Sequence, residues 1–265
     1  MPGPAIRLDG IRREFTTSGG TFVAIDDVSL DAAPGEFLAV VGPSGCGKST
    51  LLSLIAGLSF PADGSVRVLG DEVTSIQRQV GFIFQKDALL PWRTALQNIV
   101  LPLRFRGVAR AEARDRGEAW LRRVGLTKFA SSYPHQLSGG MRKRVSIAAT
   151  MAYEPKILLM DEPFSALDVE TRALMENDLL SLWELQRPTV VFITHDLQEA
   201  VQLADRVVVL SAGPARVIGE YEVRLPRPRD LAQIRYDEHA VALQRDIWAL
   251  LSAEVKKAYE TGLGG

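Results

Sequence analysis

Residues 42–50 read GPSGCGKST. This stretch fits the pattern G-x-x-x-x-G-K-[ST], in which the backbone N–H groups of a loop surround phosphate oxygens. Its glycines carry no side chains, so the backbone can curl tightly and aim those groups inward. Lys48 would add a positive charge for the outer phosphates, and Ser49 a hydroxyl for Mg²⁺. The predicted phosphate contacts come from Gly42, Pro43, Ser44, Gly45, Cys46, Gly47, Lys48, Ser49 and Thr50.

The flanking residues predict a strand, the loop and then a helix. FLAVV (37–41) is a short apolar run suited to a buried strand, and STLLSLIAG (49–57) has helical spacing with a glycine at its end. The N-terminus of that helix would add partial positive charge to the anion site. An ordinary glycine-rich turn is the alternative. A dinucleotide-binding G-x-G-x-x-G loop does not fit, because two residues separate the first two glycines.

A second apolar run, ILLMDEP (157–163), ends in two carboxylates. In a parallel sheet, ligand-binding groups collect at the carboxyl ends of the strands. Asp161 is suited to binding Mg²⁺ indirectly, and Glu162 to polarising an attacking water. A strand followed by a solvated acidic turn is the alternative, which the phosphate loop makes less favourable.

A third motif, LSGGMRKR (137–144), directly precedes a helical run that Pro155 halts. Ser138, Gly139 and Gly140 at a helix start would form a second anion site. One nucleotide does not need two such sites within one protomer, so we expect this one to serve the nucleotide of a partner protomer. A plain serine N-cap followed by flexible glycines is the alternative.

The order and spacing of these motifs resemble the ATP-binding cassette (ABC) ATPases, the motor subunits of ABC transporters. The resemblance covers about residues 5–225, and LSGG placed shortly before ILLMDEP is its most specific part. The remaining matches are FIFQKDALLPW (82–92), SALD (165–168) and VVFITHD (190–196).

The resemblance implies roles for further residues. Gln85 would contact Mg²⁺ and the attacking water, and His195 the γ-phosphate. Asp168 would help to join two protomers. Phe15 would stack on adenine, although a core position at a strand end fits it equally well. The predicted catalytic residues are therefore Glu162, His195, Gln85 and Lys48, and the predicted Mg²⁺ ligands are Ser49, Gln85 and Asp161.

Two residues depart from the common pattern of this family. Lys143 stands where many members have Gln, and Ala149 where many have Arg. Both lie on the helix after the signature motif, beyond its phosphate-facing end. These two residues do not change the ATPase prediction, but the family pattern does not tell which local surface contacts they make.

The resemblance implies the α/β fold of P-loop NTPases (RecA-like). Its parallel sheet core would carry an antiparallel β subdomain and an inserted α-helical subdomain. We expect the nucleotide-binding core and β subdomain in residues 1–87 and 155–225, and the helical signature subdomain in 88–154. A linker and a helix would follow in 226–265, and the stretch LPRPRD (225–230) is predicted to be an extended linker.

Composition limits the classes of protein and the cellular locations that fit this chain. The chain has 265 residues and a formal net charge of −1, so no global field recruits nucleic acid. Its one cysteine fits a reducing compartment, and three histidines with one cysteine make no convincing zinc site. Neither a run of 18 apolar residues nor a signal-peptide pattern is present, so we expect a peripheral protein at the cytoplasmic face of the membrane.

We therefore predict an ATPase that uses ATP and Mg²⁺ and drives a transporter by dimerising around ATP. A DNA-repair or chromosome-associated ABC ATPase would carry a long coiled coil, but only about 90 residues separate Lys48 from Ser138, without sustained heptads. Translation-type proteins usually have two cassettes, and a nucleotide kinase would leave LSGGMRKR unexplained. An ABC ATPase for export or lipid trafficking remains an alternative.

LLPWRTALQNIVLPL (89–103) resembles importer ATPases for nitrate, sulfonates and taurine. The expected partners are a second copy of the ATPase subunit, transmembrane permease subunits and, indirectly, an extracytoplasmic substrate-binding protein. An apolar Leu-Leu-Pro-Trp stretch in a surface loop also predicts a docking site for the permease. The alternative is that Trp92 fills the junction between subdomains.

Overall fold

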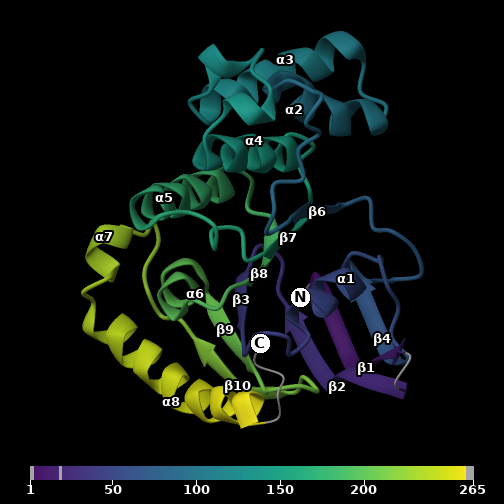
Figure 1. Cartoon of the computed structure of the whole chain (residues 1–265), viewed down its shortest axis with the longest axis vertical. Helices are drawn as coiled ribbons and strands as arrows, with labels where there is room; N and C mark the ends of the chain where they lie inside the picture. The colour runs from purple at the N-terminus through teal and green to yellow at the C-terminus, as the bar shows by residue number, and fades with distance from the viewer. Residues whose placement is uncertain (1–2, 18–19, 261–265) are drawn as a thin grey trace. The chain divides into compact units, whose positions relative to one another are not determined.

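The structure is a computed structural model that describes residues 3–17 and 20–260 (Figure 1). These residues form two compact units. The first contains the described residues up to Val80, then Ile157–Glu162, and those from Arg187 onward; the second contains Gly81–Lys156 and Pro163–Gln186. Compared with the predicted domain division, the helix over 169–186 joins the second unit and the described part of 226–265 joins the first. The predicted division into functional domains stays a prediction.

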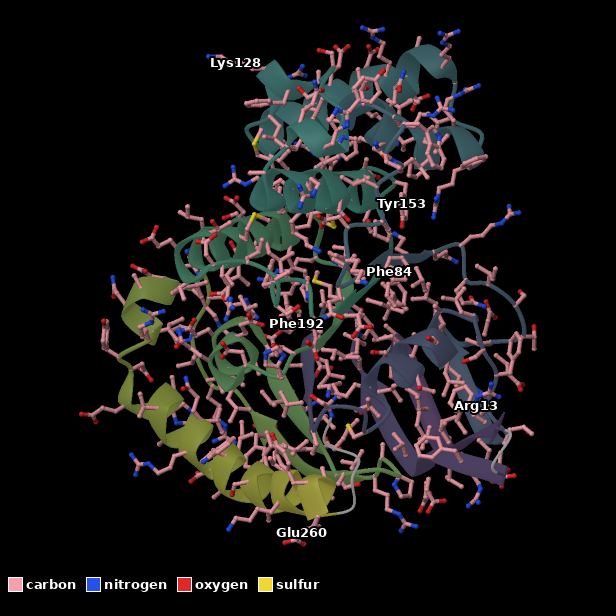
Figure 2. All side chains as sticks on the ribbon, in the orientation of Figure 1. Arg13, Phe84, Lys128, Tyr153, Phe192 and Glu260 are labelled. Carbon is pink, nitrogen blue, oxygen red and sulfur yellow. The ribbon has the colours of Figure 1, made fainter. Side chains whose placement is uncertain are left out.

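The first unit is built on a largely parallel sheet with the strand order β10-β9-β3-β8-β7. Three strands, β3 (Phe37–Val41), β7 (Ile157–Asp161) and β8 (Thr189–Ile193), run in the same direction. All five residues of β3 and of β8 are buried, as expected for strands that are covered on both faces. Phe192 of β8 lies in this interior (Figure 2). The parallel α/β core implied by the sequence is confirmed.

A hairpin that turns at Gly213-Pro214 extends this sheet. Strand β9 (Arg206–Leu210) continues the parallel sheet, and β10 (Val217–Glu222) returns antiparallel beside it. A separate antiparallel sheet has the order β2-β1-β4-β5. Its strands are β1 (Ile6–Thr17), β2 (Gly20–Ala32), β4 (Asp63–Val68) and β5 (Asp71–Glu72).

Helices of the first unit follow strand ends. Helix α1 (Lys48–Ile55) starts at the phosphate loop, and α6 (Leu197–Leu203) follows β8. The predicted C-terminal helix is divided into α7 (Leu231–Ile234) and α8 (Glu238–Glu260), and α8 packs against α6 and β10 (Figure 1). Among the residues described, no helix is both long and apolar enough to cross a membrane.

The stretch LPRPRD, predicted as an extended linker, contains neither helix nor strand, and it is held against the end of α6. Arg229 donates to the carbonyls of Gln202 and Ala204, both at 2.8 Å, and its side chain is fully buried. Arg227 donates to the carbonyl of Leu203 at 2.7 Å. Because these carbonyls end a helix, they lack partners within it and attract cations. These contacts were not predicted, because arginines read as solvated residues in a sequence.

The second unit is helical, as predicted. Strand β6 (Val80–Ile83) leads into it, and the helices α2 (Ala95–Phe105), α3 (Arg110–Arg123), α4 (Gly139–Met151) and α5 (Val169–Gln186) follow. Short 3₁₀ turns, η1 (Thr127–Phe129) and η2 (Pro134–Gln136), connect α3 to α4. Thr94 and Gln97 form a capping box at the start of α2. The signature motif lies at the start of α4, with Ser138 as the N-cap residue of that helix.

Candidate active site

The phosphate loop joins β3 to α1 in the first unit. Lys48 is only 6% exposed, and its ammonium donates to the carbonyls of Gly42 and Pro43, both at 2.8 Å. Gly47 has φ +111, and a Cβ placed there would lie 2.8 Å from the carbonyl oxygen of Ala24. Only glycine fits this position without displacing the backbone.

The single cysteine lies inside this loop. Cys46 is buried, and burial raises the pKa of its thiol. A buried neutral thiol is a poor nucleophile, which favours a spacer role over redox chemistry.

Ser49 and Asp161 bring two oxygen donors together from different parts of the chain. Ser49, in the first turn of α1, donates its hydroxyl to the Asp161 carboxylate at the end of β7, at 3.0 Å. Burial, with help from the nearby Glu162, raises the pKa of Asp161, whereas Ser49 and Lys48 act against that rise. A hydroxyl beside a carboxylate that lacks full charge compensation fits Mg²⁺, which prefers oxygen ligands.

Glu162 and His195 form the second pair of the first unit. Oε2 of Glu162 lies 3.0 Å from Nδ1 of His195. Glu162 has φ +42, in the left-handed region, and its N–H donates to the carbonyl of Ile193 at 2.9 Å. Because β7 and β8 are parallel neighbours, their carboxyl ends deliver both side chains to one edge of the sheet.

The segment after His195 is held firmly. Asp196 caps α6 by accepting from the N–H groups of Gln198 and Glu199, and Thr194 donates to the Glu199 carboxylate at 2.6 Å. These contacts fix the backbone on both sides of His195. The imidazole itself stays 58% exposed, so it is accessible to a ligand.

Phe15 lies on β1 of the first unit and is 38% exposed. The guanidinium of Arg13 lies over its ring, 4.7 Å from the centroid. Arg13 is at the surface of the antiparallel sheet (Figure 2). The exposure disfavours the reading of Phe15 as a core residue, and adenine stacking stays a prediction.

The other predicted site residues belong to the second unit. Ser138 caps α4 by accepting from the N–H of Met141 at 3.3 Å, so the plain N-cap is realised whether or not nucleotide binds there. Gly140 has no space for a side chain, because a Cβ would lie 2.7 Å from Cγ2 of Thr171. Asp168 accepts from the N–H of Thr171 at 2.9 Å, and this hydrogen bond lowers the pKa of Asp168.

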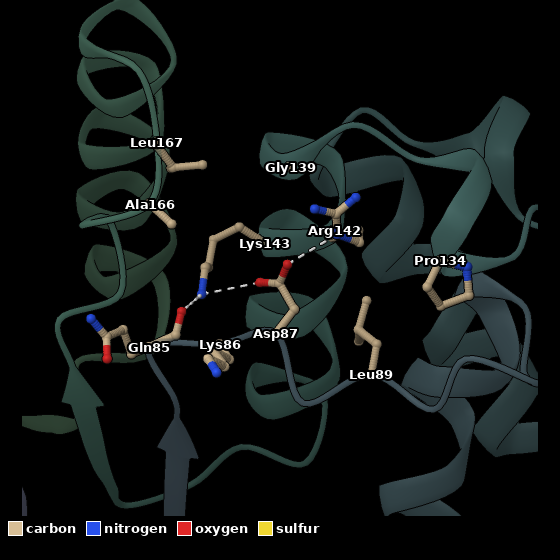
Figure 3. Close-up of a pocket in the computed structure, with 10 residues that line it drawn as sticks. All are labelled: Gln85, Lys86, Asp87, Leu89, Pro134, Gly139, Arg142, Lys143, Ala166 and Leu167. Atoms are coloured by element: carbon tan, nitrogen blue, oxygen red, sulfur yellow. Dashed lines mark hydrogen bonds and ion pairs between the residues drawn. The ribbon is translucent and has the colours of Figure 1, made fainter.

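Gln85 donates from Nε2 to the hydroxyl of Ser165 at 3.3 Å. Its segment borders an open pocket of about 500 Å³ within the second unit (Figure 3). The lining residues are Gln85, Lys86, Asp87, Leu89, Pro134, Gly139, Arg142, Lys143, Ala166 and Leu167.

Lys143 corrects one sequence-based expectation. Its position was read as one of local surface contacts, but the residue is 3% exposed. Its ammonium lies 3.1 Å from the Phe84 and Gln85 carbonyls and 3.1 Å from Oδ1 of Asp87. Neither Asp87 nor Ser165 was predicted as a site residue. The departure from the family pattern at Lys143 was the one signal in the sequence.

The structure thus brings together Lys48, Ser49, Asp161, Glu162 and His195 in the first unit. Gln85, the signature residues and Asp168 are built into the second unit. No group of three or more His, Cys, Asp or Glu residues that could hold a metal occurs among the described residues.

Comparisons with known proteins agree with this geometry. The sequence profile of the ABC transporter family matches residues 25–165. An uncharacterized ABC transporter ATP-binding protein of Methanocaldococcus jannaschii is 42% identical over 253 residues, which cover 96% of this chain and 93% of that protein. The nitrate import ATP-binding protein NrtD of Synechococcus elongatus is 41% identical, over 91% of this chain and 89% of that protein.

Among solved structures, a dimeric ATP-binding cassette in a post-hydrolysis state with ADP and phosphate matches with a TM-score of 0.74. It is 34% identical and covers 83% of this chain and 100% of its own. The fold, the phosphate loop beside paired carboxylates and this level of identity lead to one conclusion. The chain belongs to the ABC transporter family and is an ATP-binding ATPase of that family.

Proposed function

We propose that this chain is the ATPase subunit of an importer for nitrate, a sulfonate, taurine or a similar small solute, and that two copies close around ATP. One observation carries the chemistry. At the carboxyl edge of one sheet, Ser49 lies 3.0 Å from Asp161, and the adjacent Glu162 lies 3.0 Å from His195. That arrangement supports the proposal, because oxygens of the kind that Mg²⁺ prefers lie next to a carboxylate that could act as a base.

Each residue has a defined task in the proposed reaction. Ser49, Asp161 and Gln85 would hold Mg²⁺, which supplies charge neutralisation at the phosphate oxygens. Glu162 accepts a proton from the attacking water, and His195 orients the Glu162 carboxylate and contacts the γ-phosphate. Lys48 leaves the carbonyls of Gly42 and Pro43 and turns to the β- and γ-phosphates, which are stronger acceptors for its ammonium.

The signature motif would complete the site of the other protomer. Ser138 and Gly140 at the start of α4 would meet the γ-phosphate held by a partner chain. Asp168 would contribute to the same interface, and Phe15 would stack on adenine. The dimeric relative bound to ADP and phosphate supports this arrangement. Because the γ-phosphate would bridge both surfaces, hydrolysis would remove the bridge and reopen the dimer.

Mixing two variants tests the shared site. Lys48→Ala should weaken nucleotide binding in the chain that carries it, whereas Ser138→Arg should spare binding by a monomer and block closure and hydrolysis. In a mixed dimer, one site pairs an intact phosphate loop with an intact signature motif. Partial rescue of hydrolysis on mixing is the expected result. Absence of rescue, with mixed dimers shown to form, contradicts the proposal.

The importer assignment comes from similarity to proteins whose names state import. NrtD is named for nitrate, and the stretch 89–103 resembles the importer group as a whole. The chain would sit at the cytoplasmic face of the membrane through contacts with permease subunits, which receive the solute from a binding protein. Reconstitution with the permease and each candidate solute tests the cargo, with solute-stimulated ATP hydrolysis as the readout.

The permease contact would involve the loop that precedes α2. Trp92 is 68% exposed, although tryptophan is mostly buried in proteins. The loop is nonetheless well held, because the buried Asn98 accepts from the N–H of Leu90 and donates to the carbonyls of Leu90, Arg93 and Thr94. A rigid loop that presents an exposed tryptophan is typical of an interface anchor.

We expect Trp92→Ala to leave ATP binding and the melting temperature of the isolated chain unchanged and to weaken co-purification with the permease. Transport should fall more than basal hydrolysis. Phe105→Ala is the matched control, because Phe105 is an aromatic residue at the other end of α2 and is 83% exposed. A large drop in melting temperature with normal co-purification would make Trp92 a structural residue instead.

A further inference from the structure

We propose that Lys143, together with Asp87, is a positioning residue that fixes the main chain of Gln85 to the signature helix α4. The proposal rests on the proposed function, in which Gln85 contacts Mg²⁺ and the attacking water. It adds a residue that acts on catalysis through Gln85 without touching nucleotide.

The contacts of Lys143 are direct: two hydrogen bonds to main-chain carbonyls and an ion pair with Asp87 (Figure 3). From the second turn of α4, the Lys143 ammonium donates to the carbonyls of Phe84 and Gln85, both at 3.1 Å, and lies 3.1 Å from Oδ1 of Asp87. Two N–H donors of the ammonium are used by the carbonyls, and Asp87 balances its charge. Because the Lys143 side chain is only 3% exposed, water offers these groups little competition.

Asp87 makes this cluster a paired charge. Its side chain is 18% exposed and also accepts from Nε of Arg142 at 3.2 Å. Arg142 in turn donates to the carbonyl of Leu137, just before the signature serine. Two neighbouring cations of α4 therefore hold a carboxylate two residues after Gln85. Removing Asp87 would leave the buried charge of Lys143 without a carboxylate partner, so the pair holds its geometry strongly.

Lys143 and Asp87, called the clamp below, hold the backbone of Gln85 and leave its side chain able to change partners. The Gln85 amide makes a long hydrogen bond of 3.3 Å to the exposed hydroxyl of Ser165, a contact between neutral groups. A contact of this length is weak, so rotation of the side chain can release the amide oxygen for a metal ion or a water. Lys143 would therefore set where the amide can reach, and its loss should reduce turnover more than ATP affinity.

Many members of the family have Gln at the position of Lys143. A glutamine amide has N–H donors for the two carbonyls but no charge, so it cannot balance the Asp87 carboxylate. In this chain the lysine and the aspartate form one unit.

Steady-state ATP hydrolysis by the full-length chain tests the proposal. Lys143→Met should lower kcat about tenfold, equivalent to about 1.4 kcal/mol, with little change in KM for ATP. It should also raise the Mg²⁺ concentration that gives half-maximal rate. Lys86→Met is the matched control, because Lys86 is exposed beside Gln85 and makes no ion pair within the described part of the chain. Its kinetic constants should stay near those of the wild type.

A double-mutant cycle separates positioning from structural damage. In a Gln85→Ala background, Lys143→Met should cause no further loss of kcat, because the group it positions is already absent. Losses that multiply would overturn the proposal. If Gln85→Ala alone leaves hydrolysis unchanged, the proposed role of Gln85 fails, and the clamp is then judged by amide hydrogen exchange. Lys143→Met should speed exchange in the peptide that contains residues 84–88, and unchanged exchange there refutes the clamp.

Folding of the variants is the remaining control. If Lys143→Met fails to fold because Asp87 is left with Arg142 alone, the neutral pair Lys143→Gln with Asp87→Asn removes the charges of the Lys143–Asp87 pair together. This double variant should fold and still lose turnover without losing ATP affinity. Wild-type kcat and wild-type Mg²⁺ dependence in the folded double variant would overturn the proposal.

Discussion

Replacing Glu162 by Gln is the sharpest test of the proposed chemistry, because the structure separates its effect on catalysis from its effect on folding. The carboxylate lies 3.0 Å from Nδ1 of His195, and a glutamine side chain has the same shape and can keep that contact. The backbone at this residue has φ +42, and the strain of that conformation is the same for both residues because both carry a Cβ. The variant should therefore melt at the wild-type temperature.

Catalysis should respond very differently. A neutral amide cannot accept the proton of the attacking water, and loss of a general base costs about 100- to 10,000-fold in rate. That loss corresponds to about 3–5 kcal/mol in activation free energy. ATP binding should persist, because the phosphate loop is untouched. Closed dimers should therefore accumulate with ATP and be visible by size-exclusion chromatography.

The assay is phosphate release at saturating ATP and Mg²⁺, with melting temperature and elution volume measured on the same samples. Glu72→Gln is a suitable control, because Glu72 is an exposed acid of β5 in the same unit. Hydrolysis by Glu162→Gln within about twofold of the wild type would remove Glu162 from the role of base. A lowered melting temperature would show that the contact with His195 is needed for the fold instead.

Two further predictions concern the stability of the first unit. Gly57→Ala should lower the melting temperature more than Gly70→Ala. Both glycines have positive φ, +71 and +91, so a side chain is strained at either position. A Cβ at Gly57 would also lie 2.1 Å from the carbonyl oxygen of Ser75, whereas a Cβ at Gly70 would meet no atom within 4 Å. Equal losses would show that backbone strain alone matters. Glu254 of α8 accepts from the N–H of Ala212 at 2.9 Å, and although burial opposes it, an ion pair within the helix and this hydrogen bond lower the pKa of Glu254. A carboxyl whose pKa is lowered in the folded state stabilises the fold above its unfolded pKa of about 4.3, and this stabilisation is lost as the pH falls through the folded pKa. The difference in melting temperature between the wild type and Glu254→Gln should therefore be largest near neutral pH and shrink toward pH about 4.

Motifs with fixed local spacing were readable from the sequence. A phosphate loop works through the backbone of consecutive residues, so residues 42–50 specify its shape without help from the rest of the chain. The apolar runs that precede it and that precede Asp161 have the length and composition of strands buried on both faces, and both are strands. The pairing of Ser49 with Asp161 then followed from parallel strands that end at one edge.

Contacts between charged groups far apart in the sequence needed the tertiary structure. Lys143 donates to a carbonyl 58 residues away, and Gln85 to a hydroxyl 80 residues away. Periodicity tells which face of a helix is apolar, but a lysine or arginine reads as solvated wherever it stands. Whether such a cation is exposed or buried depends on which carbonyls and carboxylates the fold brings to it.

The same reason explains the stretch 225–230, which reads as an extended linker. In the fold, the last carbonyls of α6 lack partners of their own, and Arg227 and Arg229 supply them. The sequence by itself determined the family, the phosphate loop and the paired carboxylates, because each resides in a short, local pattern. The tertiary structure decided which cations hold which backbone, because that choice depends on packing between segments that no local pattern relates.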